Sequence, residues 1–142
     1  MKNIAMVRNL CLMVLLSMSI LRCARQEVRF PKIEEQVRQY VDISEYSGVY
    51  VFDEYSCSIC SVNVFGSIKD ELKGKNYIVL YAEANYKNYT YENSVLAGYI
   101  PETKIIPADP LLIETLRTET NTYKGNYKLD IKNKIIVSIK NY

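Results

Sequence analysis

The feature that most restricts the fold is a pair of strand-like runs on either side of a helix-like stretch. Val49–Phe52 and Tyr77–Tyr81 are uncharged and rich in β-branched and aromatic residues, which is typical of buried strands. Apolar residues between them recur every four positions, as on one face of a helix: Cys60, Val64, Ile68 and Leu72. A strand, a helix and a strand in succession predict a βαβ unit with two parallel strands.

Other segments predict three further helices and three further strands. Helices are expected over 32–42, over 91–100 before Pro101, and from Asp109, whose carboxylate can cap the first turn. Strands are expected over 104–106, 127–131 and 135–139, the last two forming a hairpin around Asn133. Alternating strands and helices of this kind indicate an α/β domain.

The N-terminus has the pattern of a secretory signal. Lys2 and Arg8 precede the uncharged run Leu10–Leu21, which is too short to cross a hydrocarbon core of about 30 Å. We therefore interpret residues 1–22 as a signal peptide, 23–31 as a tether and 32–142 as the folded domain. The protein is expected to be exported and to function outside the cytoplasm.

Cys23 follows this run in a context similar to a bacterial lipoprotein box, although Arg22 stands where such boxes have a small residue. Three fates remain open for the N-terminus: lipidation of Cys23, cleavage elsewhere to give a soluble protein, or retention as an uncleaved anchor. Lipidation or retention would attach the domain to a membrane, on the periplasmic side or at the cell surface.

Composition excludes several function classes. The chain of 142 residues contains no histidine, which removes hydrolases that use a histidine as their general base. Its 18 Lys and Arg nearly balance 16 Asp and Glu, and no stretch forms a basic face, so nucleic acid is not an expected partner. We expect no metal or other cofactor, because zinc would need two more ligands beside the remaining cysteines.

The strongest candidate for a chemical site is the motif Cys57-Ser-Ile-Cys60, between the first strand and its helix. A cysteine at a helix N-terminus faces free N–H groups and the positive end of the helix dipole, which favour the thiolate. Cys57 is then the nucleophile in thiol–disulfide exchange and Cys60 resolves the mixed disulfide. The alternative is an inert structural disulfide, although so short a loop gains little stability from closure.

Two acidic residues precede the motif. Asp53 and Glu54 would disfavour a thiolate nearby. They are interpreted either as a solvated strand end or as a proton shuttle for Cys60.

Tyrosines are concentrated in one part of the chain: Tyr81, Tyr86, Tyr89, Tyr91 and Tyr99. They could form a stacking platform for a sugar or a peptide. The alternative is a half-buried surface on which tyrosine fills space with an apolar ring and a polar tip.

The order of these segments resembles the thioredoxin-like superfamily, and within it the membrane-tethered redoxin-type branch. Val49–Phe52 with Cys57-Ser-Ile-Cys60 is similar to the family's strand and active-site turn, and 129–135 to its closing hairpin. The resemblance implies a three-layer α/β/α sandwich with a mixed central sheet, here without the final helix. It also implies exchange of disulfides with protein thiols through Cys57 and Cys60.

The chain departs from the family pattern just before the penultimate strand. The family has a cis-proline before the penultimate strand, where it helps to hold the partner's chain, and this sequence has Lys124 there, preceded by Tyr123. The departure motivates an alternative function, that of a non-catalytic thioredoxin-like lipoprotein that binds a partner through its tyrosine-rich face.

Overall fold

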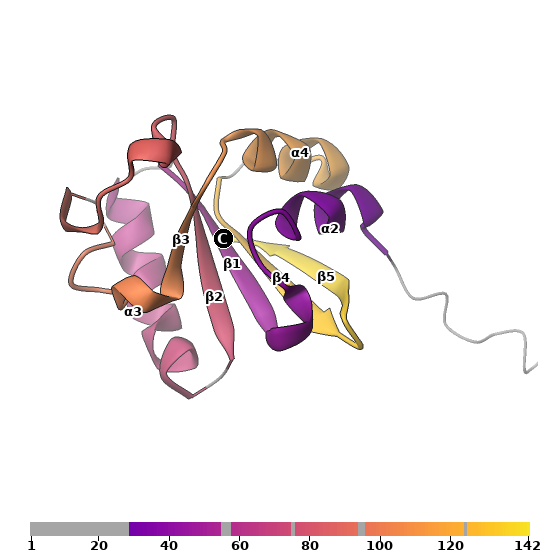
Figure 1. Cartoon of the computed structure of the whole chain (residues 1–142), viewed down its shortest axis with the longest axis horizontal. Coiled ribbons are helices and arrows are strands. Elements are labelled where there is room, and N and C mark those ends of the chain that lie inside the picture. The colour runs from indigo at the N-terminus through magenta and orange to yellow at the C-terminus, as the bar shows by residue number, and fades with distance from the viewer. Residues whose placement is uncertain (1–28, 55–57, 75, 94–95, 124) are drawn as a thin grey trace, which may run out of the picture.

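A mixed sheet forms the centre of the molecule (Figure 1). The computed structural model describes residues 29–54, 58–74, 76–93, 96–123 and 125–142, with the side chains of 58–62 and 93 left out. Its five strands lie in the order β3-β2-β1-β4-β5. β1, β2 and β3 are parallel, β4 is antiparallel to β1, and β5 is antiparallel to β4. The strands are β1 (Gly48–Asp53), β2 (Tyr77–Ala82), β3 (Ile105–Ala108), β4 (Tyr127–Lys132) and β5 (Ile135–Asn141).

Two helices lie side by side on one face of the sheet, α2 (Pro31–Val37) and α4 (Leu111–Thr120) (Figure 1). Their apolar residues pack on side chains from β1, β2, β4 and β5 in one buried cluster, which includes Ile33, Leu116 and Leu129. Lys32 at the start of α2 also forms a 2.9 Å ion pair with Glu119 near the end of α4. The two helices therefore form one layer over this face.

The third helix, α3 (Ser58–Gly74), covers the opposite face (Figure 1). Its residues Phe65, Ile68 and Leu72 pack on the alternate side chains of β1 and β2 in a second buried cluster, which is rich in aromatic rings. The rings of Phe52 and Phe65 lie 4.6 Å apart. Because α3 connects the parallel strands β1 and β2, the predicted βαβ unit and α/β class are confirmed.

One predicted helix is wrong. The described residues of 91–100 form a 3-10 turn over Tyr91–Asn93 and further turns that include Gly98, not an α-helix. The hydroxyl of Tyr91 donates to the carbonyl of Ile100 at 2.7 Å and accepts the N–H of Gly98 at 3.3 Å. Such side-chain bonds satisfy the backbone without a helix, and Gly98 adopts a φ of 81° that interrupts helical geometry.

Polar side chains occupy the α3 face of β4 and β5. Lys128 binds Glu71 of α3 at 2.6 Å, and Asp130 binds Ser138 at 2.7 Å and Lys140 at 3.2 Å. No helix follows β5 within the last described range, 125–142. The polar pairs allow this part of the sheet to face water.

Candidate redox site

The candidate site lies at the edge of the sheet where the three parallel strands end. β1 ends at Asp53 and α3 begins at Ser58, so the cysteine motif occupies the connection at this edge. From here α3 covers one face of the sheet and α4 the other. In open α/β sheets, ligands and reaction centres favour the carboxyl ends of the strands where helices diverge to opposite faces.

The cysteines are only partly covered by the structure. Cys60 is the third residue of α3, and its side chain is not described. Cys57 lies outside the described residues and precedes Ser58 directly in the sequence. Cys23 and the interpreted signal and tether up to residue 28 also lie outside them.

Asp53 is buried, which corrects its interpretation as part of a solvated strand end, whereas Glu54 is exposed as that interpretation expected. Only 5% of Asp53 is exposed, and its Oδ2 accepts a 2.8 Å hydrogen bond from Nη2 of Arg117. Its N–H donates to the side-chain oxygen of Asn126 at 3.4 Å. A buried carboxylate is stable only when it is paired in this way.

Glu54 and Glu83 place two more carboxylates at the same edge. Glu54 is exposed, and its Oε2 accepts a 3.1 Å hydrogen bond from the N–H of Ala84, next to Glu83. Partial burial raises the pKa of Glu83 above its ordinary value, and the negative charge of Glu54 raises it further. The edge therefore holds two carboxylates that repel each other, in addition to Asp53, whose charge is offset by Arg117.

The partners Arg117 and Asn126 were not predicted from the sequence. They lie 64 and 73 residues from Asp53 in the chain and reach it only because α4 and β4 converge on the end of β1. The sequence offers one weak signal, which is that Asp53 ends an otherwise apolar run. A charge at the end of a buried strand needs a partner, but the sequence does not identify it.

Among the residues that the structure describes, Tyr123 is the most exposed large apolar side chain. It is 92% exposed and precedes β4, whose Tyr127 pairs with Val51 of β1. The adjoining Lys124, which stands where the family resemblance leads us to expect a proline, lies outside the described residues.

The five clustered tyrosines do not form one platform. Tyr81 is 3% exposed, and burial followed by the charge of Glu54 raises its pKa to about 12. Tyr89 packs its ring against Tyr81 at 5.9 Å, while Tyr86 lies beside α2 and α4. Tyr91 and Tyr99 line a common cavity. Most of the group therefore fills space.

Comparisons of the chain with protein-family models, with curated protein sequences and with solved structures found no match. Within the described ranges, none of the helices has both the length and the hydrophobicity needed to cross a membrane.

Proposed function

We propose that this chain is a thioredoxin-like domain that exchanges disulfides with protein thiols through Cys57 and Cys60. The observed elements occur in the order that the family resemblance implies: a strand, the cysteine motif, a helix, parallel strands and a closing hairpin. Helices on both faces of the mixed sheet agree with an α/β/α sandwich.

One observation carries the proposal: α3 begins at Ser58, immediately after Cys57 and at the carboxyl edge of β1. The N–H groups of the first turn of a helix lack intrahelical partners and stabilise a negative charge placed before them. A thiolate at Cys57 would benefit from this field. The 17-residue length of α3 gives the helix a full dipole.

The proposed reaction transfers two electrons between the cysteine pair and a partner protein. The Cys57 thiolate attacks one sulfur of a partner disulfide, which breaks the partner's S–S bond and releases one partner thiolate. The Cys60 thiolate then attacks the sulfur of Cys57, which forms the internal disulfide and releases the second partner thiolate. The partner gains the two electrons and the cysteine pair loses them, and the reverse sequence oxidises a partner dithiol.

The local electrostatics moderate this reactivity. The Arg117 guanidinium offsets the charge of Asp53, whereas Glu54 and Glu83 remain as negative charges near the end of β1. Negative charge raises the pKa of a nearby thiol. We therefore propose a thiol that is less acidic than the helix dipole alone would make it.

Export places this chemistry outside the cytoplasm. In such a compartment protein disulfides persist and serve as substrates. We propose that the domain is attached to the membrane through residues 1–22 or through a lipid on Cys23.

Insulin reduction in the presence of dithiothreitol tests the proposal. Cys57→Ser should abolish the acceleration over dithiothreitol alone. Cys60→Ser, incubated with insulin before dithiothreitol is added, should accumulate a mixed disulfide that dithiothreitol then releases. Cys23→Ser is the matched control and should react at the wild-type rate. Equal rates for Cys57→Ser and wild type would disprove the function.

A binding role that does not use the cysteines is the second candidate. The cavity beside Tyr91 and Tyr99 favours it, because Tyr99 is 41% exposed there. It predicts that a Cys57→Ser/Cys60→Ser variant keeps its biological activity while variants of the cavity lose theirs.

A further inference from the structure

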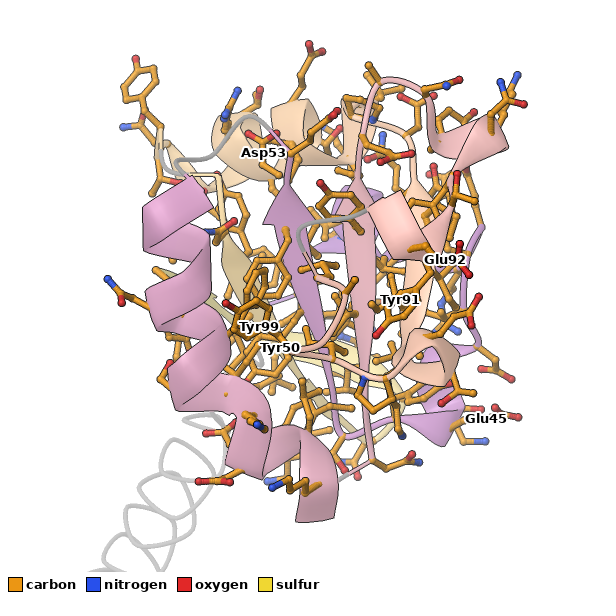
Figure 2. The ribbon with its side chains drawn as sticks, turned by 90° about the vertical axis from the view of Figure 1, so that its left-hand side faces the viewer. Glu45, Tyr50, Asp53, Tyr91, Glu92 and Tyr99 are labelled. Atoms are coloured by element: carbon orange, nitrogen blue, oxygen red, sulfur yellow. The ribbon has the colours of Figure 1, made fainter. Side chains whose placement is uncertain are left out.

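A cavity of about 400 Å³ lies between the second half of α3 and the turns over 98–104. Its residues come from α3 on one side (Lys69, Leu72 and Lys73) and from the turns on the other (Tyr99 and Lys104). In Figure 2, Asp53 lies at the upper end of the sheet, whereas Tyr99 lies lower, beside α3. Lys69 is nine residues after Cys60, about 13 Å along the helix axis, so the cavity is separate from the cysteine motif.

The inner side of the cavity is apolar and held in place. Leu72 and Ile100 are 7% and 1% exposed and belong to the buried cluster under α3. Tyr91 binds the backbone on both sides of Tyr99 through its hydroxyl, to the carbonyl of Ile100 and the N–H of Gly98. A volume of this size and an apolar wall formed in advance are typical of small-molecule sites.

The rim carries positive charge. Lys69, Lys73 and Lys104 line the cavity, and none of its described lining residues is acidic. Lys73 has one ion pair, with Asp70 at 3.9 Å, and both side chains are largely exposed, so that pair neutralises little of the charge. Lys69 and Lys104 form no ion pair with any other described residue. No acidic side chain among the described lining residues offsets the charge of these three lysines.

We propose that this cavity binds a small organic anion with an apolar body. The apolar part lies against Leu72, Ile100 and the ring of Tyr99, and the anionic group faces the lysines at the rim. The three cations supply the charge complement of a carboxylate, sulfonate or phosphate, and the closed inner wall excludes water from the apolar part. The proposal does not depend on the cysteine pair.

Two fluorescent probes with a common ring system test this assignment. 1-Anilinonaphthalene-8-sulfonate carries an anion, and N-phenyl-1-naphthylamine is the same scaffold without it. A Lys69→Gln/Lys73→Gln/Lys104→Gln variant should bind the sulfonate about tenfold more weakly, because three partly screened charges are lost, and should bind the neutral probe as wild type does. Raising the salt from 0.1 M to 1 M, which shortens the Debye length from about 10 Å to about 3 Å, should weaken only sulfonate binding.

Two further variants serve as controls. Lys87→Gln/Lys132→Gln/Lys134→Gln removes the same charge from exposed lysines elsewhere and should leave both probes bound. Thr103→Trp, at an exposed position in the cavity lining, should fill the cavity and reduce binding of both probes. Urea unfolding of each variant verifies that the fold is kept.

The outcomes are distinct. The proposal is supported if Lys69→Gln/Lys73→Gln/Lys104→Gln loses binding of the sulfonate alone and Thr103→Trp loses binding of both probes. Equal sulfonate binding by the two triple-lysine variants would overturn the anion site. Undiminished binding of both probes by Thr103→Trp would overturn the cavity as the location.

Discussion

Arg117 and Asp53 join the last turn of α4 to the last residue of β1 through a 2.8 Å ion pair. The side chain of Asp53 is 4% exposed and that of Arg117 is 39% exposed, so the arginine lies on the solvent side of the buried carboxylate. It holds α4, which lies on one face, to the strand that leads into the cysteine motif. The end of that strand is therefore held by a residue that lies 64 positions away in the chain.

The first prediction concerns this pair. Arg117→Met keeps most of the side-chain volume but removes the guanidinium from a buried carboxylate, so we expect the free energy of unfolding to fall by about 2–3 kcal/mol. Lys32→Met is the control, because its 2.9 Å pair with Glu119 involves a lysine side chain that is 74% exposed, and its effect on the free energy of unfolding should be much smaller. Urea unfolding at pH 7 measures both. Equal losses would show that burial of Asp53 does not matter.

The carboxylates at the edge should control the reactivity of Cys57. Glu54→Gln/Glu83→Gln removes two negative charges, so the pKa of the Cys57 thiol should fall by roughly half a unit to one unit. The pH dependence of iodoacetamide alkylation measures this in a chain whose other cysteines are serine. Glu114→Gln, an exposed change on α4, should leave the profile unchanged. An unchanged profile in the double variant would separate these carboxylates from the proposed reaction.

Tyr123 should contribute to recognition of protein substrates. Its ring is 92% exposed next to the proposed site, so a bound peptide can stack on it. Tyr123→Ala should lower kcat/KM for insulin about threefold to tenfold and leave the reduction of bis(2-hydroxyethyl) disulfide unchanged. Leu111→Ala, which changes a 55% exposed residue on α4, should alter neither rate. A parallel loss on both substrates would indicate a structural effect instead.

The sequence predicted the βαβ unit and the hairpin because their patterns are local. Uncharged β-branched runs and a period of three to four residues are visible in a short window, and the observed strands differ from the predicted ones by two residues or fewer at each end. The hairpin turn was found through Asn133, which adopts a φ of 53° that asparagine tolerates well. Asp109 also caps α4, since its Oδ1 accepts the N–H of Leu111 at 2.9 Å.

Tertiary contacts decided the features that the sequence did not predict. A helix was expected over 91–100 before Pro101, but the hydroxyl of Tyr91 binds the backbone of the turns instead. Arg117 reaches Asp53 only because α4 packs on the sheet, a contact between segments far apart in the chain. The lysines of the cavity come from α3 and from Lys104, two segments whose proximity no local pattern indicates.

Two glycines should respond in opposite ways to alanine. A Cβ at Gly48 would overlap the ring of Tyr77 and lie 2.9 Å from the carbonyl oxygen of Leu129, so Gly48→Ala should cost about 2–4 kcal/mol. Gly66 lies within α3 with open space around it, so Gly66→Ala should add about 0.5–1 kcal/mol. Thermal and urea unfolding measure both changes. Destabilisation by Gly66→Ala would mean that the helix needs the glycine for another contact.

The last prediction concerns alkaline pH and the group formed by Tyr50, Glu71 and Lys128. Glu71 Oε2 accepts hydrogen bonds from the Tyr50 hydroxyl at 2.5 Å and from Lys128 Nζ at 2.6 Å. Burial, and then the bond to Glu71, raise the pKa of Tyr50 above its ordinary value of 10.0. Burial alone would lower the pKa of Lys128, but its hydrogen bonds to Glu71 and Tyr50 raise it above 10.5.

Because both pKa values are raised in the folded state, the folded state should lose stability at high pH. The folded chain holds these two protons more tightly than the unfolded chain, so the free energy of unfolding should be constant up to about pH 10 and fall above it. Tyr50→Phe/Lys128→Met should lose about 1–2 kcal/mol at pH 7 because Glu71 loses these two hydrogen bonds, and it should show a smaller decline between pH 10 and pH 12. Urea unfolding across this range tests the prediction, with Tyr123→Phe as the exposed control. Parallel pH profiles for the wild type and the double variant would show that other groups cause the alkaline loss.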